Sequence, residues 1–218
     1  SLTPTIGASI EANHPMHLSY GSAGLGGSNT VLALASSELF YQVARRAAIG
    51  DASPIVTVSE TSAIPLAQDT LRRAYAAQGL VARHRVTNVR WYPSGARSLA
   101  FAVALSAMLR DDDVHGNVLA GSFGAELALI ADTAIRRDQY LIAASDQPEG
   151  QAIAYATSTE TLIGEEMFAA AAYLDDDPRA SAHAAAMDTL RWLLILFIFF
   201  TTFSAGNEGF RQFLGAVL

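Results

Sequence analysis

The chain has 218 residues, 51% of them hydrophobic, and a formal net charge of −7. All 14 basic residues are arginine, and neither lysine nor cysteine occurs, which excludes a P-loop lysine, a Schiff-base lysine, a thiol nucleophile and cysteine-ligated zinc or iron–sulfur sites. The acidic balance, without a basic stripe carrying aromatic residues, indicates that nucleic acid is not a partner. The length suits one α/β domain with a sizeable core plus a short additional segment.

The first strand–turn–helix unit follows an N-terminal arm. Residues 1–15 have few periodic positions and are expected to be irregular, although 6–12 could form one or two helical turns. Residues 16–20 alternate like a strand, and a glycine-rich turn occupies 21–27. A helix is expected from Thr30 to Ala48, closed by a glycine at position 50.

The same pattern recurs along the chain. Strands are predicted at 54–59, 86–91, 116–120, 140–145 and 161–163, and helices at 65–79, 96–109, 125–136, 148–155 and 165–174. Strands that alternate with helices of about 10–15 residues indicate right-handed βαβ crossovers. We therefore predict a mainly parallel, doubly wound α/β sheet over 16–177, with helices on both faces.

The C-terminal region predicts a membrane helix. The segment from Trp192 to Ala205 is uncharged and apolar on every helical face, as in a helix buried in a large protein or in lipid. We expect one helix over 178–206, with its transmembrane part at about 190–206, and a tail at 207–218. About 15 residues reach only ~22 Å of a ~30 Å hydrocarbon core, so the span needs its flanks or local thinning. The residues expected in the membrane are Trp192, Leu193, Leu194, Ile195, Leu196, Phe197, Ile198, Phe199 and Phe200.

The orientation of this span follows from the flanking charges. Arg179 and Arg191 precede the apolar run and Arg211 follows it, which is a weak positive-inside bias. The first residues carry no export signal. We expect a single-pass protein of the cell inner membrane with its globular domain in the cytoplasm.

Several stretches carry a resemblance to a known family. The most specific are 161–174 (TLIGEEMFAAAAYL) and 188–192 (DTLRW), followed by the apolar run. Further matching stretches lie at 17–21, 54–58, 66–69, 71–75 and 121–126. The chain resembles bacterial membrane-anchored proteins, found in phototrophic and other filamentous bacteria, that are known only as a domain of unknown function. The resemblance covers nearly the whole chain and implies a membrane-bound, Rossmann-like α/β domain, but it implies no catalytic residue.

A candidate ligand edge lies where the predicted strands end. Open α/β sheets bind ligands outside the carboxyl ends of their strands, and a glycine turn before a helix can hold an anion. The spacing departs from the dinucleotide fingerprint, because the third glycine position falls on Asn29, and Glu60 lies about 35 residues from the glycines instead of the usual ~20. The residues of this candidate edge are Gly21, Gly24, Gly26, Gly27, Ser59, Glu60, Gly121, Ser122, Glu126 and Glu165.

Alternative chemistries at this edge are weaker. Ser122 lies in a small-x-Ser-x-small turn that resembles a nucleophile elbow, but the downstream His183 is on the membrane-proximal helix. The carboxylates could gather around a hard cation, whereas Glu165 also suits the first turn of a helix. His14 and His17 have no third ligand in view and are expected at the surface or a strand end. We therefore predict no catalytic residue and no metal ligand, and we name no cofactor.

Two functions remain open. We favour a membrane-anchored structural or assembly module, because no complete catalytic set is present and the helix face at 169–172 is made of small residues that permit close packing. Its expected partners are the lipid bilayer and either a second copy of the chain or a membrane protein complex. The alternative is a small-molecule or nucleotide-binding enzyme that uses the glycine-rich edge.

Overall fold

The fold was analysed in a computed structural model. It describes residues 2–94, 98–164, 166–170 and 178–206, and of residues 169, 178–187 and 203–206 it describes the backbone only. The chain divides into two compact units, residues 1–174 and 175–218, which are described separately.

The first unit contains a six-stranded sheet in the order β3-β2-β1-β4-β5-β6, in which every neighbouring pair is parallel. The predicted parallel α/β sheet is therefore confirmed. The order reverses direction between β1 and β4, as in dinucleotide-binding folds. The strands are β1 (Met16–Gly21), β2 (Ile55–Val58), β3 (Val89–Trp91), β4 (Gly116–Ser122), β5 (Tyr140–Ser145) and β6 (Glu160–Thr161).

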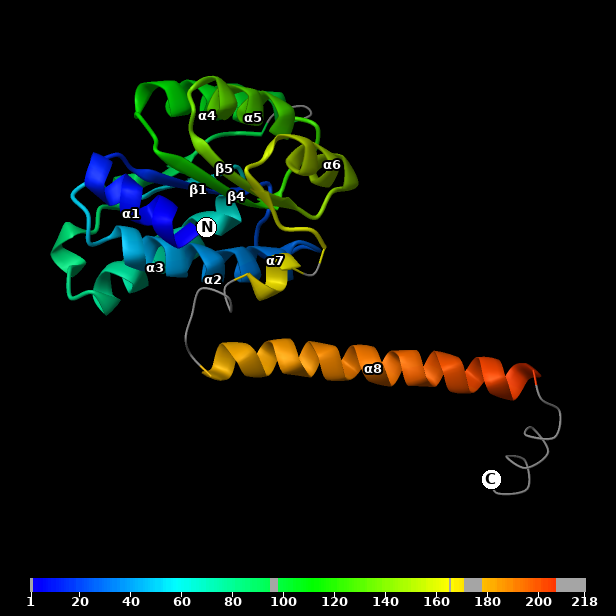
Figure 1. The fold of residues 1–218 in the computed structure, drawn as a ribbon. Coiled ribbons are helices and arrows are strands. Elements are labelled where there is room, and N and C mark those ends of the chain that lie inside the picture. The colour runs from blue at the N-terminus through cyan, green and yellow to red at the C-terminus, as the bar shows by residue number, and fades with distance from the viewer. Residues whose placement is uncertain (1, 95–97, 165, 171–177, 207–218) are drawn as a thin grey trace. The chain divides into compact units, whose positions relative to one another are not determined.

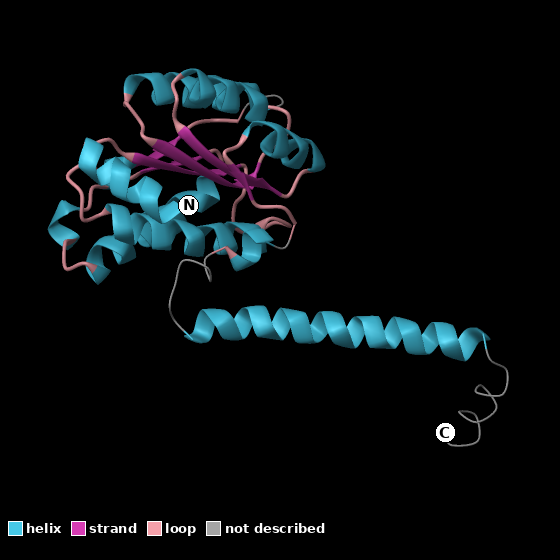
Figure 2. Ribbon diagram, in the orientation of Figure 1, coloured by secondary structure: helices cyan, strands magenta, loops and turns pink. Residues whose placement is uncertain are grey.

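Helices cover both faces of this sheet (Figures 1 and 2). One face packs against α1 (Leu2–Ala12), α2 (Thr30–Ala47), α3 (Ile64–Ala77) and α7 (Glu166–Ala169). The other packs against α4 (Leu99–Asp111), α5 (Leu127–Arg136) and α6 (Pro148–Thr157). Strands β1, β2 and β4 are buried along their whole length because both of their faces are covered.

The N-terminal arm is helical over more of its length than the one or two turns that the sequence allowed at 6–12. Residues 2–12 form α1, and Leu2 and Ile6, one helical turn apart, are buried against the core with Ile10 partly buried beside them. Burial of this apolar stripe outweighs the low helix propensity of Pro4 and Gly7. The third strand begins at Val89 and not at 86, because residues 86–88 form a single 3₁₀ turn.

The second unit contains α8 (Pro178–Gly206), a helix of 29 residues. In its described part the apolar side chains from Trp192 to Phe200 are between 46% and 71% exposed. Over the residues that the structure describes, no helix is both long and apolar enough to cross a membrane.

Candidate functional site

The candidate site lies at the carboxyl ends of the strands, around the point between β1 and β4 where the strand order reverses. In open α/β sheets this point leaves a crevice that receives the ligand. Here the backbone N–H and the hydroxyl of Ser22 both donate to the carbonyl of Ser122, at 2.9 and 3.0 Å. These two hydrogen bonds join the loops that leave β1 and β4, so the crevice is closed at its base.

Gly21 and Gly121 permit this closure. A Cβ atom at Gly121 would lie 2.0 Å from the carbonyl oxygen of Tyr20, and one at Gly21 would lie 2.4 Å from that of Ser122. Gly21 also has a φ of +58°, which glycine adopts without strain. Both glycines belong to the candidate ligand edge, and the structure places each against the neighbouring strand.

Ser59, Ser122 and Glu126 are also held by contacts within the protein. Ser59 donates its hydroxyl to the carbonyl of Gly21 at 2.9 Å, and Ser122 accepts the side-chain amide of Gln147 at 2.9 Å. The carboxylate of Glu126 accepts the backbone N–H of Gly124 at 2.9 Å. All three side chains are buried, so these residues brace the loops. Glu165, the last residue of the predicted edge, lies outside the described residues.

The glycine-rich loop after β1 uses several of its amides internally. The N–H of Ala23 donates to the carbonyl of Tyr20 at 3.1 Å, and the N–H of Leu25 donates to the hydroxyl of Ser62 at 3.0 Å. The N–H of Gly26 donates to the hydroxyl of Thr30, also at 3.0 Å. Amides that point at protein acceptors are not available to cradle a phosphate, which is the function that the loop would have in a nucleotide site.

A small hollow remains between this loop and the segment of residues 60–62 that precedes α3. Its volume is about 160 Å³, below the ~300 Å³ at which ordinary small-molecule pockets begin. The loop packs closely against Ser62 at Gly24, because a Cβ at Gly24 would lie 2.6 Å from the hydroxyl oxygen of Ser62. Of the predicted edge, the structure brings Gly24, Gly27 and Glu60 together here, and Gly26 lies in the same loop. The hollow is lined by Ser22, Gly24, Leu25, Gly27, Ser28, Asn29, Glu60 and Ser62.

A larger depression of about 570 Å³ lies at the opposite edge, near the amino ends of β4 and β5. It opens broadly to solvent and lies away from the carboxyl edge that α/β sheets use for ligands. Its lining residues are Pro4, Thr5, Ala8, His115, Ile135, Asp138, Gln139, Tyr140 and Thr159. Among the residues that the structure describes, no group of three or more His, Asp or Glu side chains is placed to hold a metal ion.

Comparison with known proteins gives a family without an assigned function. The model of DUF6754, a domain of unknown function, matches residues 3–212. The chain belongs to the DUF6754 family. No curated protein and no solved structure matches it. The family membership agrees with the unknown biochemistry that the sequence resemblance implied, and it assigns no role to any residue.

A buried polar chain, meaning a series of linked side-chain hydrogen bonds, lies in this DUF6754 domain and was not predicted from the sequence. His17, expected near the surface or a strand end, is fully buried on the α4–α5 face of the sheet. Its Nδ1 lies 2.8 Å from Oδ1 of Asn117 and its Nε2 lies 2.8 Å from the hydroxyl of Thr57. Thr57 continues to Ser19 at 2.8 Å, and Asn117 donates to Gln139 at 3.1 Å. This polar chain thus crosses the three adjacent strands β2, β1 and β4.

The direction of this hydrogen-bond chain follows from the charge of His17. Burial, opposed in part by the hydrogen bond to Asn117, lowers the pKa of His17 from 6.5 to about 4, so the ring is neutral at pH 7 and carries one proton. Because Asn117 donates its amide to Gln139, its oxygen accepts the Nδ1–H of His17. Nε2 then accepts the hydroxyl of Thr57, whose oxygen lies 2.8 Å from that of Ser19. Each ring nitrogen of the neutral His17 therefore has a partner.

Proposed function

We propose that this DUF6754 chain is a membrane-tethered α/β module that works by assembling with itself or with a membrane protein complex. The observation that carries the proposal is the run of apolar side chains on α8, each about half exposed or more. Shielding an exposed Leu, Ile or Phe from water is worth roughly 1.5–3 kcal/mol. The run from Leu193 to Phe200 therefore forgoes on the order of 10 kcal/mol, which is comparable to the net stability of a whole domain.

Two environments would shield these apolar side chains from water. The lipid bilayer is the first, with the neighbouring residues of α8 or local thinning completing the span. The same helix from a second copy or from a membrane complex is the other. The crevice between β1 and β4 is closed, and the loop amides of Leu25 and Gly26 already have protein acceptors. Both observations favour an assembly role over nucleotide chemistry.

Ending the chain after Asp188 is expected to move the protein from the membrane fraction to the soluble fraction. The full chain should pellet with membranes and require detergent, whereas residues 1–188 should remain in the supernatant with the circular dichroism of a folded α/β domain. The opposite result has two parts: the truncated chain unfolds, and the full chain is a soluble monomer without detergent. That result would show that the helix belongs to the core of the domain.

A substitution within the full chain sharpens this test. Leu194→Arg with Phe197→Arg places two charges in the middle of the run, each costing roughly 3 kcal/mol in a membrane. The exchange Leu194→Phe with Phe197→Leu is the matched control, because it keeps the composition and apolarity. The variant with the two introduced arginines should become extractable from membranes by alkaline carbonate, while the control variant should resist extraction as the wild type does.

The orientation of the module is part of the proposal. Arg179 and Arg191 on the domain side of the run, against Arg211 beyond it, favour a cytoplasmic domain at the inner membrane. Protease added to intact cells should leave the domain uncut, and protease added to opened cells should digest it at exposed arginines. Rapid digestion in intact cells would reverse the orientation.

A small polar ligand at the hollow is the second candidate. Glu60, two residues after the end of β2, lines the same hollow as Gly24 and Gly27, where an acidic side chain of a dinucleotide-binding fold holds a ribose. Ribose added to ¹⁵N-labelled protein should then shift the amide resonances of Gly24 and Gly27 in the wild type but not in Glu60→Gln. Unchanged spectra would remove this candidate.

A further inference from the structure

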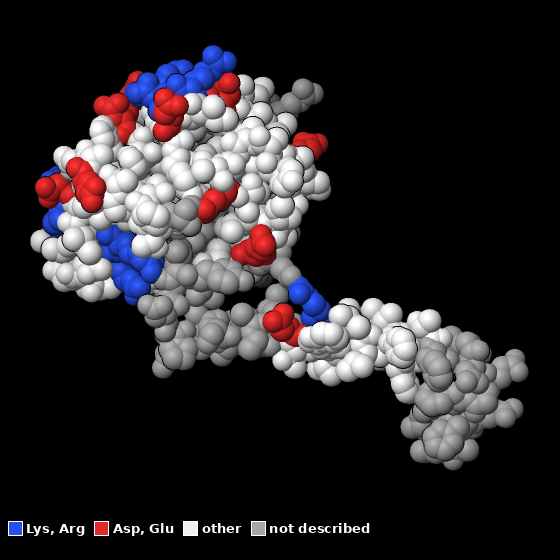
Figure 3. All heavy atoms as spheres, in the orientation of Figure 1, with Lys and Arg blue, Asp and Glu red and all other residues white. Residues whose placement is uncertain are grey.

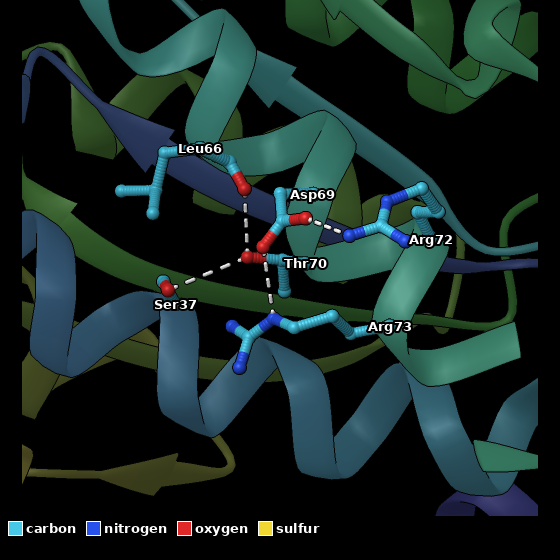
Figure 4. Close-up of polar contacts among 6 residues, drawn as sticks. All are labelled: Ser37, Leu66, Asp69, Thr70, Arg72 and Arg73. Atoms are coloured by element: carbon cyan, nitrogen blue, oxygen red, sulfur yellow. Dashed lines mark hydrogen bonds and ion pairs between the residues drawn. The ribbon is translucent and has the colours of Figure 1, made fainter. Parts of the chain in front are cut away.

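Helix α3 shows how a helix on the surface of the first unit divides its side chains (Figure 4). On its inner side the hydroxyl of Thr70 lies 3.3 Å from that of Ser37 on α2. On its outer side the carboxylate of Asp69 pairs with Arg72 at 2.6 Å and with Arg73 at 3.0 Å, and all three side chains are about half exposed. Charged groups thus cover the side of α3 that faces solvent.

Helix α8 has no such division over residues 188–202, the part whose side chains the structure describes. The charged residues of this part are Asp188 and Arg191, which pair at 3.8 Å. On the face shown in Figure 3, the rest of this part is white, that is, uncharged. At 3.6 residues per turn, Asp188 and Arg191 project away from the side of α8 that carries Leu193, Leu196 and Phe200. That side therefore carries no charge between residues 188 and 202.

A groove of about 450 Å³ runs along this uncharged side. Four residues that line it have the spacing i, i+3, i+4 and i+7, and they are Leu193, Leu196, Phe197 and Phe200. We name these four residues the α8 seam. Each is between 47% and 66% exposed. Four residues with this spacing form the hole that receives one side chain of a facing helix in knobs-into-holes packing.

We propose that the α8 seam packs against the α8 seam of a second copy of the chain, with the two helices parallel. The inference rests on the proposed tether, because two domains on the same side of one membrane require parallel helices. In a parallel pair with Leu193 and Phe200 at heptad position a and Leu196 at position d, the hole of each seam receives Leu196 of the other chain. Leu196 is therefore both a knob and part of a hole, which gives the self-complementary surface that a two-fold pair requires.

The area and the charge of the seam favour a second copy over lipid chains alone. Each half-exposed seam side chain offers on the order of 100 Å², so two seams cover roughly 800 Å². The flanking Trp192 and Phe199 are 65% and 71% exposed, and they extend this area towards the ~1,000 Å² at which specific interfaces begin. Two seams can also meet without burying Asp188 or Arg191. In lipid, such close packing is what drives the association of helices.

Single cysteines test the pairing directly, because the chain contains no cysteine. Membranes that hold the full chain are oxidised with copper phenanthroline, and the product of twice the chain mass is measured on non-reducing gels. A disulfide needs Cα atoms within about 7 Å of each other, which parallel seams provide at like positions that face one another. The seam variants Leu193→Cys, Leu196→Cys and Phe200→Cys should cross-link, whereas the control variants Leu194→Cys, Ile195→Cys and Ile198→Cys should not.

Two alanine variants provide a matched second measurement. Leu194 and Leu196 are both 61% exposed, so Leu194→Ala and Leu196→Ala lose the same apolar surface. Sedimentation equilibrium in detergent micelles should show a dissociation constant at least about 10-fold higher for Leu196→Ala, because a knob and part of a hole are lost from both chains. Leu194→Ala should stay within about 2-fold of the wild type, because Leu194 projects away from the seam. Both variants should remain in the membrane fraction.

The outcomes separate the pairing from the tether. A full chain that stays in the membrane fraction but cross-links at none of the six positions overturns the pairing and leaves the tether standing. Equal cross-linking at all six positions, or equal effects of the two alanine variants, also overturns the pairing, because random collisions or apolarity alone would then explain the contact. Cross-linking confined to the seam in a chain that stays in the soluble fraction supports the pairing and contradicts the tether.

Discussion

Replacing Gly121 with alanine is expected to lower the free energy of unfolding by at least about 3 kcal/mol. The added Cβ would lie 2.0 Å from the carbonyl oxygen and 2.5 Å from the carbonyl carbon of Tyr20. Those atoms belong to the backbone of β1, so they cannot move away without separating β1 from β4 at the centre of the sheet. Urea unfolding followed by circular dichroism measures the loss.

Gly27→Ala is the matched control for this prediction. No heavy atom lies within 4 Å of a Cβ at Gly27, and its backbone does not have the positive φ of Gly26. The same change of one methyl group should therefore alter the stability by less than about 1 kcal/mol. A Gly121→Ala protein that unfolds at the same urea concentration as the control would show that β1 and β4 can separate at their carboxyl ends. The closed crevice would then be open to a ligand after all.

Gly121 shows why the ligand edge was only partly predictable. A glycine in a turn after a strand permits either close approach of a ligand or close approach of another strand, and the sequence looks the same in both cases. Gly121 was included in the candidate edge because it directly follows a predicted strand, and the position of the Tyr20 carbonyl shows that it serves the approach of another strand. That position depends on the pairing of β1 with β4, about 100 residues apart in the chain. Local patterns do not contain such a contact.

The parallel sheet was predictable because it rests on periodic local signals. Alternating strands and amphipathic helices require crossovers, and these crossovers bury both faces of the sheet. The full extent of helix α1 was not predictable, because Pro4 and Gly7 argue against a helix and the burial of Leu2 and Ile6 becomes visible only in the fold. The sequence did contain a usable sign of the buried polar chain. His17 and Ser19 alternate with apolar residues in a strand whose two faces were both expected to be covered.

Acidification is expected to destabilise the domain through His17 before most carboxylates titrate. Burial is the main reason that the pKa of His17 is lowered from 6.5 to about 4, with Arg90 lowering it further and Asn117 and Asp112 opposing the shift. The unfolded chain takes up a proton near pH 6.5, whereas the folded chain resists protonation down to about pH 4. The contribution of neutral His17 to the free energy of unfolding is therefore fully present above pH 6.5 and is lost as the pH falls towards 4. The loss between pH 7 and pH 5 should be about 2 kcal/mol.

His17→Gln isolates this contribution from that of the other histidines. Burial also lowers the pKa values of His84 and His115, and both residues remain in the variant, so subtracting its unfolding curves from those of the wild type leaves the part due to His17. The variant should be less stable at pH 7, because the hydrogen bonds to Asn117 and Thr57 are disturbed, but its stability should fall less between pH 7 and pH 5. The ring resonances of His17 in the folded wild type should titrate with a midpoint near 4. A midpoint near 6.5 would mean that water reaches the ring, and the polar chain would then be an open channel through the sheet instead of a sealed part of its core.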